Sequence, residues 1–419
     1  MNALGLIVEY NPFHNGHTYH LDQAKRLTGA DLTVCVMSGN FIQRGEPAII
    51  NKWARTKTAL LSGIDLVIEL PVVYSMASAE FFAFGAVKIL DSLGIVNHIC
   101  FGSENGNTEM LGLIADILVQ EPDAYKKHLK ASLAEGLSYP SSREYALKKY
   151  SGDIGLYKDS FDGILGFSNN ILGIEYIKAI KKLKSNIKPI AIKRINNLYN
   201  SEVITGSISS ATAVRKDIFK NTDGTLCGIS DKTLPSYSLS VLKEEFINGR
   251  GPVSADMYEN LILGLMRKMP AEKIAALPYV NEGLENRLKE ASRNSGSIDE
   301  LLQKVCTKRY TRTRLQRILF SILTGLTSDE FEEFNRHGGP QYIRVLGFNK
   351  NGRDMLSEIK KTAVMPIITK AANYKNSCSP LLKRMLEIEA AATDIYVLAY
   401  KSPEYRKAGQ EYTQNIIRL

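Results

Sequence analysis

Cysteine is scarce in the 419-residue sequence, and its five cysteines are widely separated. Two of them, Cys35 and Cys100, lie inside apolar runs that are typical of strands. Disulfide frameworks use cysteines in even numbers, and zinc sites commonly use Cys-x-x-Cys pairs, so the sequence indicates reduced, buried thiols. Reduced thiols suit the cytoplasm, where we expect the protein to lie.

Long apolar runs are also missing. No stretch of about 20 consecutive apolar residues occurs, and no basic leader precedes an apolar stretch at the N-terminus. We therefore expect neither a membrane-spanning segment nor a secretion signal. Internal repeats, heptads and low-complexity tracts are absent from the sequence as well.

Positive charge is in excess. The chain has 53 Lys and Arg against 44 Asp and Glu, which gives a formal net charge of +9 at pH 7. This balance favours an anionic partner, although many basic proteins bind no nucleic acid. The contents of 44% hydrophobic and 23% charged residues are ordinary for a globular protein, and the length allows two domains or more.

The N-terminal stretch predicts a strand, a tight polar loop and a helix. Residues 4–8 form an apolar run, and residues 10–17 are mostly polar. Leu21, Ala24 and Leu27 then recur at helical spacing. The most distinctive residues of the chain lie at the end of this loop.

The loop contains the motif His14-Asn15-Gly16-His17. Glycine lets the backbone approach an anion, a helix N-terminus offers unpaired N–H groups, and two imidazoles add donors, so the motif predicts a cradle for a phosphate ester. Two alternatives are that the histidines are solvated or cap the core, which is commoner for His-x-x-His, and that they ligate a metal. The position directly after the first strand of an α/β unit favours the cradle. Because the histidines beyond residue 20 are scattered, we predict no metal site.

Short apolar strands alternate with helical segments through the first half of the chain. Strands are predicted at residues 31–37, 64–70, 95–101 and 187–193, and helices at 51–61, 76–93 and 171–183. This alternation predicts an α/β fold with a doubly wound, Rossmann-like parallel sheet and right-handed crossovers. Ligands bind to such sheets outside the carboxyl ends of the strands.

Two polar segments in this half have more than one interpretation. The loop at residues 38–47 either lies over a ligand at the sheet edge or is a surface crossover, which is slightly favoured; Arg44 and Glu46 are its charged candidates. Asn169 or Asn170 is a natural N-cap for the helix that follows. The same helix start, facing the carboxyl edge of the sheet, also suits recognition of a nucleotide, and the two roles are compatible.

A second anion site is predicted further along the chain. Arg194 follows the last predicted strand, and Ser209 or Ser210 suits the N-cap of another helix, with Arg215 about a turn and a half later. Hydroxyls, helix-start amides and guanidinium groups together suit a leaving pyrophosphate. The segment resembles the Ile-Ser-Ser-Thr-x-x-Arg element of adenylyltransferases, with Ala211 at the usual threonine.

The pattern of elements changes after residue 233. We predict an α/β domain at residues 1–233, with a lysine-rich helical insertion at about 107–162, and a mainly helical domain at 234–419. A strand-like stretch at 342–353 suggests a small return of sheet. Helices of the second domain are predicted at 240–248, 255–268, 283–292, 298–306 and 312–323.

The most telling segment of the helical domain is residues 304–317. It contains six basic residues, no acidic ones, and Tyr310. Such a segment suits a polyphosphate backbone, with an aromatic surface for stacking. The alternative is a solvated basic helix face. We take the segment as the candidate RNA contact, through Lys308, Arg309, Arg312, Arg314 and Arg317.

The His-x-Gly-His motif resembles the signature of the nucleotidyltransferase superfamily, whose histidines hold the phosphates of ATP while an acceptor attacks the α-phosphate. Residues 7–17, 38–47, 63–71, 101–104 and 168–176 together closely resemble the bacterial tRNA(Met) cytidine acetate ligase family. The likeness runs in order through the first half of the chain and, with weaker motifs, through the remainder. The absence of a Lys-Met-Ser-Lys-Ser loop argues against an aminoacyl-tRNA synthetase.

This resemblance implies that the protein uses ATP, with Mg2+, to activate acetate as acetyl-adenylate and then acetylates N4 of the wobble cytidine of elongator tRNA(Met). Residues 1–233 are then the ATP-binding catalytic domain and 234–419 the tRNA-binding domain. We assign catalysis to His14 and His17, which stabilise charge at the phosphates, and pyrophosphate binding to Arg194, Arg215 and the Ser209–Ser210 helix start. Acetate is already an anion and needs no general base. The implied ATP contacts are Ile7, Val8, Glu9, Tyr10, Asn11, Pro12, Phe13, His14, Asn15, Gly16, His17, Thr18, Tyr19, His20, Gly102, Asn169 and Arg194.

Two other functions fit part of the sequence. An adenylyltransferase for a small phosphorylated metabolite would share the phosphate cradle but leave the basic helical half without a role. A non-catalytic RNA-binding protein on the same fold would explain the charge but make His14 and His17 incidental. Acetate-dependent AMP formation without RNA separates the ligase from both.

Overall fold

The structure is a computed structural model that describes residues 1–155, 163–194, 209–220, 230–374 and 379–419. Cys35 and Cys100 are free and buried, as predicted, whereas Cys306 is free but exposed. Cys227 and Cys378 lie outside the described residues. No helix among the described residues is long and apolar enough to cross a membrane.

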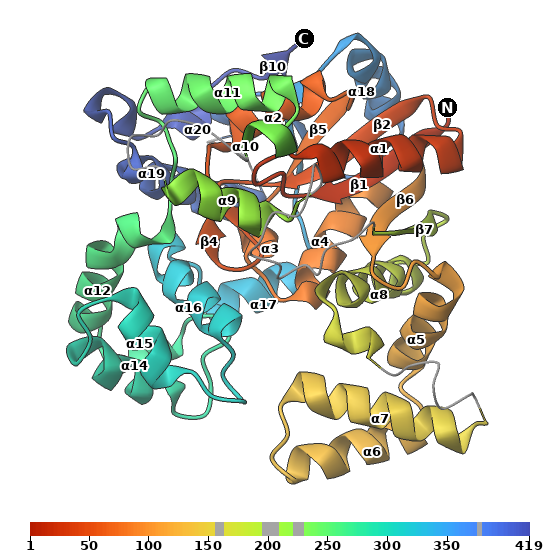
Figure 1. The fold of residues 1–419 in the computed structure, drawn as a ribbon, viewed down its shortest axis with the longest axis vertical. Coiled ribbons are helices and arrows are strands. Elements are labelled where there is room, and N and C mark those ends of the chain that lie inside the picture. Colours follow the sequence, from red (N-terminus) through yellow and green to blue (C-terminus); the bar gives the residue numbers. More distant parts are fainter. Residues whose placement is uncertain (156–162, 195–208, 221–229, 375–378) are drawn as a thin grey trace.

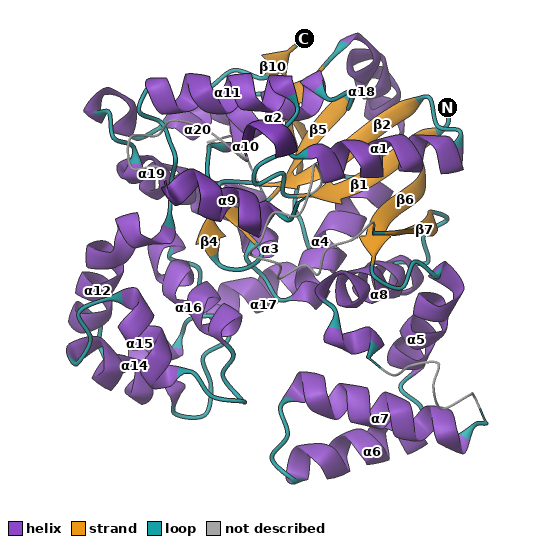
Figure 2. Cartoon of the chain, viewed as in Figure 1, coloured by secondary structure: helices purple, strands orange, loops and turns teal. Residues whose placement is uncertain are grey.

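The core of the molecule is one sheet with the strand order β10-β8-β5-β2-β1-β6-β7 (Figures 1 and 2). Five strands are parallel and follow the predicted alternation: β1 (Ala3–Val8), β2 (Leu32–Ser38), β5 (Leu66–Leu70), β6 (Val96–Ser103) and β7 (Lys188–Lys193). Strands β2 and β5 are added on one side of β1, and β6 and β7 are added on its other side. The strand order therefore reverses between β1 and β6. The predicted α/β class is confirmed.

The end of the chain returns to this sheet. Strand β8 (Ile343–Phe348) pairs with β5 antiparallel, and β9 (Ile367–Ile368) and β10 (Ile417–Arg418) pair with β8 in parallel. The sheet is therefore mixed at this edge. The expected return of sheet near residue 343 is not a separate small sheet, since it extends the N-terminal one.

Different helices cover the two faces of the sheet, because alternate strand residues point to opposite faces. Val34 and Val36 of β2 pack in the large core with α4 (Ala79–Ser92), α8 (Ser168–Lys182) and α18 (Lys350–Thr362). Cys35 and Met37 pack in a second core with α1 (Asn15–Thr28) and α2 (Lys52–Leu61). Burial on both faces explains the continuous apolar sequence of these strands.

The predicted insertion is helical in its described part, residues 107–155. Helix α5 (Thr108–Gln120) packs on α8 and β7, whereas α6 (Asp123–Ala134) and α7 (Tyr139–Asp153) form a hairpin that projects from the body (Figure 1). The hairpin is tied to α8 by an ion pair of 2.8 Å between Arg143 and the buried Glu175.

Helices dominate the rest of the chain, and those between residues 259 and 324 form a lobe at the same end of the molecule as the α6–α7 hairpin (Figure 1). The longer ones are α9 (Ala211–Lys220), α11 (Ser236–Ile247), α12 (Glu259–Lys268), α14 (Leu284–Arg293), α15 (Ile298–Val305), α16 (Arg312–Thr324), α17 (Ser328–Arg336) and α19 (Pro380–Tyr396). The shorter elements are β3 (Phe41–Ile42), β4 (Glu46–Pro47), α3 (Val72–Ser75), η2 (Ile164–Gly166), α10 (Ser230–Thr233), η3 (Ala255–Tyr258), α13 (Ala271–Ala275), η4 (Ala371–Tyr374), η5 (Val397–Ala399), η6 (Pro403–Arg406) and α20 (Gln410–Thr413).

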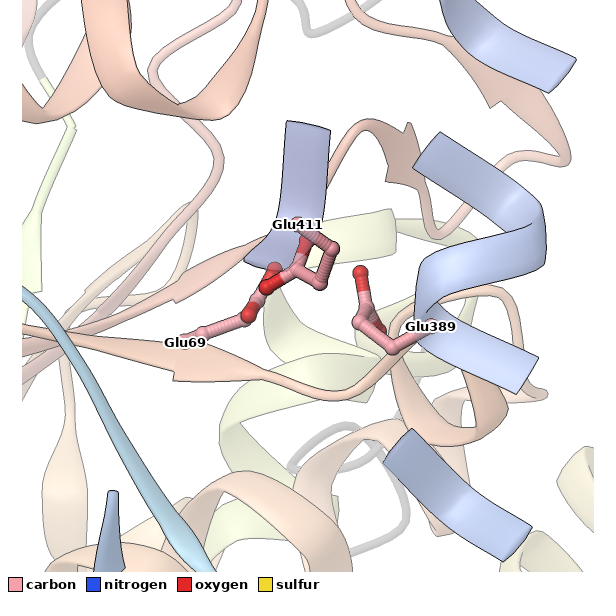
Figure 3. Close-up of side chains that lie close together, drawn as sticks. All are labelled: Glu69, Glu389 and Glu411. Atoms are coloured by element: carbon pink, nitrogen blue, oxygen red, sulfur yellow. The ribbon is translucent and has the colours of Figure 1, made fainter. Parts of the chain in front are cut away.

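A buried ionic cluster links the sheet to the C-terminal helices. Glu69, Glu389 and Glu411 converge from β5, α19 and α20 (Figure 3). The ammonium of Lys52 lies between them, 2.5 Å from Glu69, 2.5 Å from Glu411 and 3.2 Å from Glu389. Burial alone would lower the pKa of Lys52, but the three carboxylates raise it above its ordinary value. Because the ammonium occupies the position that a cation would take, we assign the cluster to structure and not to metal binding.

Candidate functional site

A cavity of about 220 Å³ opens at the carboxyl ends of β1, β6 and β7, where the strand order reverses. This is the position at which open α/β sheets bind ligands. The predicted residues that line it are Ile7, Val8, Glu9, Tyr10, Asn11, His14, Gly16, His17, Tyr19, His20, Gly102, Asn169, Arg194, Ser209, Ser210 and Arg215. The fold thus brings together segments that are up to two hundred residues apart.

Four residues of the predicted loop do not line the cavity: Pro12, Phe13, Asn15 and Thr18. The Phe13 ring is buried, and its carbonyl accepts a hydrogen bond from Ser238. The amide of Asn15 donates to the carbonyl of Lys232 at 3.0 Å. These contacts attach the loop to α10 and α11, so Phe13 and Asn15 position the site without facing it.

The histidines of the motif cap helix α1. The N–H of Gly16 donates to Nδ1 of His14 at 3.1 Å, and the N–H of His14 donates to Nδ1 of His17 at 3.2 Å. Since each Nδ1 is an acceptor, the proton of each neutral ring must lie on Nε2. The capping arrangement therefore fixes both imidazoles as Nε2–H donors at the cavity.

Burial keeps these rings uncharged. Desolvation, with the positive charges of Arg194 and Arg215, lowers the pKa of His14 from 6.5 to about 3. Desolvation, followed by the neighbouring His14 and His20, lowers the pKa of His17 well below 6.5. Both rings are neutral donors at pH 7, and the fixed positive charge of the described site comes from Lys193 and from three arginines, Arg44, Arg194 and Arg215.

Helix α9 begins at the cavity with a serine pair. Ser210 is the cap, because its Oγ accepts the N–H of Ala213 at 3.1 Å. Ser209 is also buried, and its Oγ has no hydrogen-bond partner among the described residues. The two serines thus have separate roles, and the hydroxyl of Ser209 is left without a partner within the part of the chain that the structure describes. Ile208, the first residue of this motif, lies outside the described residues.

The start of α8 differs from its prediction. Neither asparagine is the N-cap, because the helix begins at Ser168 and is preceded by Phe167. Asn169 lines the cavity and donates to Glu104 at 2.6 Å. Asn170 is buried behind it and accepts from the hydroxyl of Ser103 at 2.7 Å. Each asparagine holds the end of β6, and Asn169 is the one that faces the cavity.

The sequence left open whether the loop at residues 38–47 reaches the site, and other lining residues were missed. Ile42 of β3 and Gln43 and Arg44 of the β3–β4 turn line the cavity, so Arg44 is the charged candidate that reaches the site, whereas Glu46 does not line it. The N–H of Gln43 donates to the carboxylate of Glu9 at 2.9 Å, which brings this turn to the end of β1. The remaining unpredicted lining residues are Phe82, Phe101, Leu172, Tyr176, Ile192, Lys193, Ala211 and Thr212. The polar, glycine-punctuated composition of residues 38–47 was the signal for the turn; the apolar residues gave none.

The basic segment is divided between a turn and the first half of α16. Lys308, Arg309 and Arg312 are exposed, and Arg312 forms a 2.6 Å ion pair with Asp299. Arg314 instead donates twice to the carbonyl of Tyr279, at 2.7 and 3.1 Å. The guanidinium of Arg317 lies over the ring of Tyr279 and donates to the carbonyl of Gln43 at 3.4 Å. Fewer basic side chains of this segment are thus available at the surface than the sequence suggests.

Comparisons with known proteins agree with this geometry. The family described as HIGH Nucleotidyl Transferase matches residues 1–411. The tRNA(Met) cytidine acetate ligase of Acetivibrio thermocellus is 55% identical over 417 residues, and the protein of the same name from Thermoanaerobacter sp. (strain X514) is 47% identical over 421; both alignments cover 100% of each chain. The crystal structure of Thermotoga maritima TmcAL bound with alpha-thio ATP has a TM-score of 0.93 and 38% identity, with 100% of both chains covered.

The parallel sheet, the His-x-Gly-His cradle at its switch point and the match over most of the chain define a HIGH-type nucleotidyltransferase. Full-length identity of up to 55% then narrows the class to one group of enzymes. The chain belongs to the tRNA(Met) cytidine acetate ligase family.

Proposed function

We propose that this protein activates acetate with ATP as acetyl-adenylate, releasing pyrophosphate, and transfers the acetyl group to N4 of the wobble cytidine of elongator tRNA(Met). One observation carries the first step: two neutral Nε2–H donors and the Ser209 hydroxyl, which no described residue binds, meet Arg194 and Arg215 in one cavity. Several donors and cations with a single carboxylate, Glu9, among the described lining residues suit a polyphosphate. The names of the full-length relatives support the choice of acetate and tRNA.

In the first half-reaction, a carboxylate oxygen of acetate attacks the α-phosphate and pyrophosphate leaves. No proton has to be removed from acetate, so the site has only to align the reactants and neutralise charge. His14 and His17 donate hydrogen bonds to phosphate oxygens. Because both neutral rings already carry a proton on Nε2, neither ring has to gain or lose a proton to do so. Arg194, Arg215 and the start of α9 retain the departing pyrophosphate.

Mg2+ accompanies ATP in this proposal. Glu9 is the one carboxylate among the described residues that line the cavity, and it already accepts the N–H of Gln43. The described lining of the cavity therefore offers no set of ligands for a resident ion, and the phosphates themselves would hold Mg2+. The ion supplies further positive charge at the phosphates when bound.

In the second half-reaction, the cytosine N4 attacks the acetyl carbonyl and AMP leaves. The amine is a weak nucleophile, so positioning matters more than basicity, and the base must leave its stack to enter the cavity. We place the anticodon arm against the exposed part of the basic segment, Lys308, Arg309 and Arg312. Arg314 and Arg317 support this surface from inside.

The test uses the purified protein in two stages. Acetate-dependent exchange of labelled pyrophosphate into ATP without RNA reports the first half-reaction. Mass spectrometry of tRNA nucleosides after incubation with ATP and labelled acetate reports the second, with acetylated cytidine expected. Exchange that needs a phosphorylated metabolite in place of acetate would favour a metabolite adenylyltransferase, and RNA binding without exchange would favour a non-catalytic RNA-binding protein.

A further inference from the structure

Part of the cavity is not used by the ATP contacts proposed above. Gly102, Asn169 and Arg194 approach from β6, α8 and β7, on one side of β1. The turn between β3 and β4, which follows β2 in the chain, approaches from the other side. Phe82 of α4, a helix that contacts β1, β2 and β5, lines the same cavity. This second side has no assigned role in the reaction.

Contacts from several elements hold the β3–β4 turn in place. Gly45 has φ +73°, and a Cβ there would lie 2.5 Å from the backbone nitrogen of Arg317 and 2.7 Å from its Cα. The amide of Gln316 donates to Glu46 at 3.1 Å. On the opposite side, Gln43 donates to Glu9 at 2.9 Å. The turn is thus fixed between α16 and the end of β1, and its side chains reach the cavity from a defined backbone.

The part of the cavity near this turn combines one positively charged side chain with apolar side chains. Ile42 and Phe82 are 1% and 3% exposed, and Arg44 lines the same cavity. Among the described lining residues, Lys193, Arg194 and Arg215 are the other permanent cations, and they come from β7 and α9. Arg44 is therefore the cation on the β2 side of the cavity.

A short aliphatic carboxylate needs such a pair of features. A guanidinium binds the two carboxylate oxygens through charge-assisted hydrogen bonds, and an apolar surface covers the alkyl group. Arg44 also has an interaction within the protein, so a bound carboxylate would share or replace that contact.

We propose that Arg44 binds the carboxylate of acetate while Ile42 and Phe82 enclose its methyl group, which makes the β3–β4 turn the acceptor side of the adenylation cavity. This inference rests on the proposed function. It names a substrate-binding residue on a segment that α16, the helix of the basic segment, holds in place.

The first experiment measures acetate-dependent ATP–pyrophosphate exchange without RNA for Arg44→Ala and Arg44→Lys. We expect Arg44→Ala to raise the KM for acetate by roughly 10- to 100-fold, with the KM for ATP unchanged, because a charge-assisted hydrogen bond is lost. Arg44→Lys keeps the charge but not the planar fork, so its KM for acetate should be intermediate. Glu46→Gln is the matched control, since Glu46 lies on the same turn outside the cavity and glutamine can still accept from Gln316.

The second experiment compares propionate with acetate. Replacement of the Ile42 side chain in Ile42→Ala should make room for one more methylene and raise the propionate-to-acetate ratio of kcat/KM by roughly tenfold or more. An unchanged KM for acetate in both Arg44 variants, or a rise in the KM for ATP alone, would overturn the proposal, as would an unchanged ratio in Ile42→Ala. Melting temperatures of the variants equal to that of the unmodified protein exclude misfolding as the cause of these changes. Failure of the unmodified protein to show acetate-dependent exchange would instead refute the proposed function.

Discussion

The imidazole rings of His14 and His17 stack with their centroids 3.8 Å apart, and each ring accepts a backbone N–H through Nδ1. The two rings are therefore one unit that combines a helix cap with a pair of donors. The ring of Tyr10 packs edge-on against His17, with a centroid distance of 4.9 Å, and limits its movement. Local structure and chemistry thus depend on the same atoms.

Replacement of one histidine should impair the first half-reaction. We expect His17→Ala to reduce acetate-dependent ATP–pyrophosphate exchange by about 100- to 1000-fold, because a donor to the reacting phosphates is lost. His337→Ala, at an exposed position on the C-cap of α17, is the control. A His17→Ala protein with full AMP-forming turnover would show that the motif has only a structural role.

Burial of neutral histidines should make stability depend on pH. The pKa of His14 falls from 6.5 to about 3 in the folded protein and that of His20 to about 4, mainly through desolvation. Between these values and 6.5 the unfolded chain binds more protons, so the free energy of unfolding decreases as pH falls through this window and is fully regained above 6.5.

Urea denaturation across this window tests the histidine effect. His14→Gln should remove about 1.4 kcal/mol per pH unit from the pH dependence of the free energy of unfolding, because one fewer proton is taken up on unfolding. The exposed His337→Gln should leave that slope as it is. Equal slopes in all three proteins would contradict the buried, neutral state of His14.

Features that depend on residues close together in the sequence could be predicted. The strand, loop and helix around the His-x-Gly-His motif, and the serine cap of α9, follow from local patterns, and the structure has them. The N-cap prediction for the asparagines at the start of α8 was wrong, because their side chains form hydrogen bonds with Ser103 at the end of β6 and with Glu104, the residue that follows it. Sequence gave no sign of that competition.

Contacts between distant segments could not be predicted. The position of Gln43 in the cavity depends on Glu9, 34 residues earlier, and on Arg317, 274 residues later. Likewise, two of the three buried partners of Lys52, Glu389 and Glu411, lie at the far end of the chain. Such contacts depend on how the sheet and the helical lobe pack against each other. The sequence pattern of a single segment does not predict that packing.

The buried cluster provides a test of stability. Lys52→Met should lower the free energy of unfolding by about 3–5 kcal/mol, because Glu69, Glu389 and Glu411 would remain buried without their shared cation. Lys57→Met removes a lysine from the same helix whose 2.8 Å ion pair with Glu244 is exposed, and should cost about 0–1 kcal/mol. Urea denaturation measures both. A Lys52→Met protein as stable as the Lys57→Met control would show that the three buried carboxylates do not need the ammonium of Lys52 for stability.

Two arginines of α16 should separate RNA binding from adenylation. Arg312 is half exposed, with 50% of its side chain accessible, whereas Arg317 contacts Tyr279 and Gln43 inside the protein. We expect Arg312→Glu to weaken tRNA binding and make it less dependent on salt, since phosphate contacts release counterions. Arg317→Gln should instead reduce ATP–pyrophosphate exchange without RNA, because the β3–β4 turn loses a contact.

Filter binding of tRNA at several salt concentrations and RNA-free exchange, measured on both variants, distinguish these effects. The expected result is a crossed pattern, in which each variant changes one measurement much more than the other. If Arg317→Gln lowered tRNA affinity as strongly as Arg312→Glu and left exchange intact, Arg317 would be an RNA contact and not a support for the turn. If Arg312→Glu left both affinity and its salt dependence unchanged, the anticodon arm would have to bind elsewhere than the exposed basic segment.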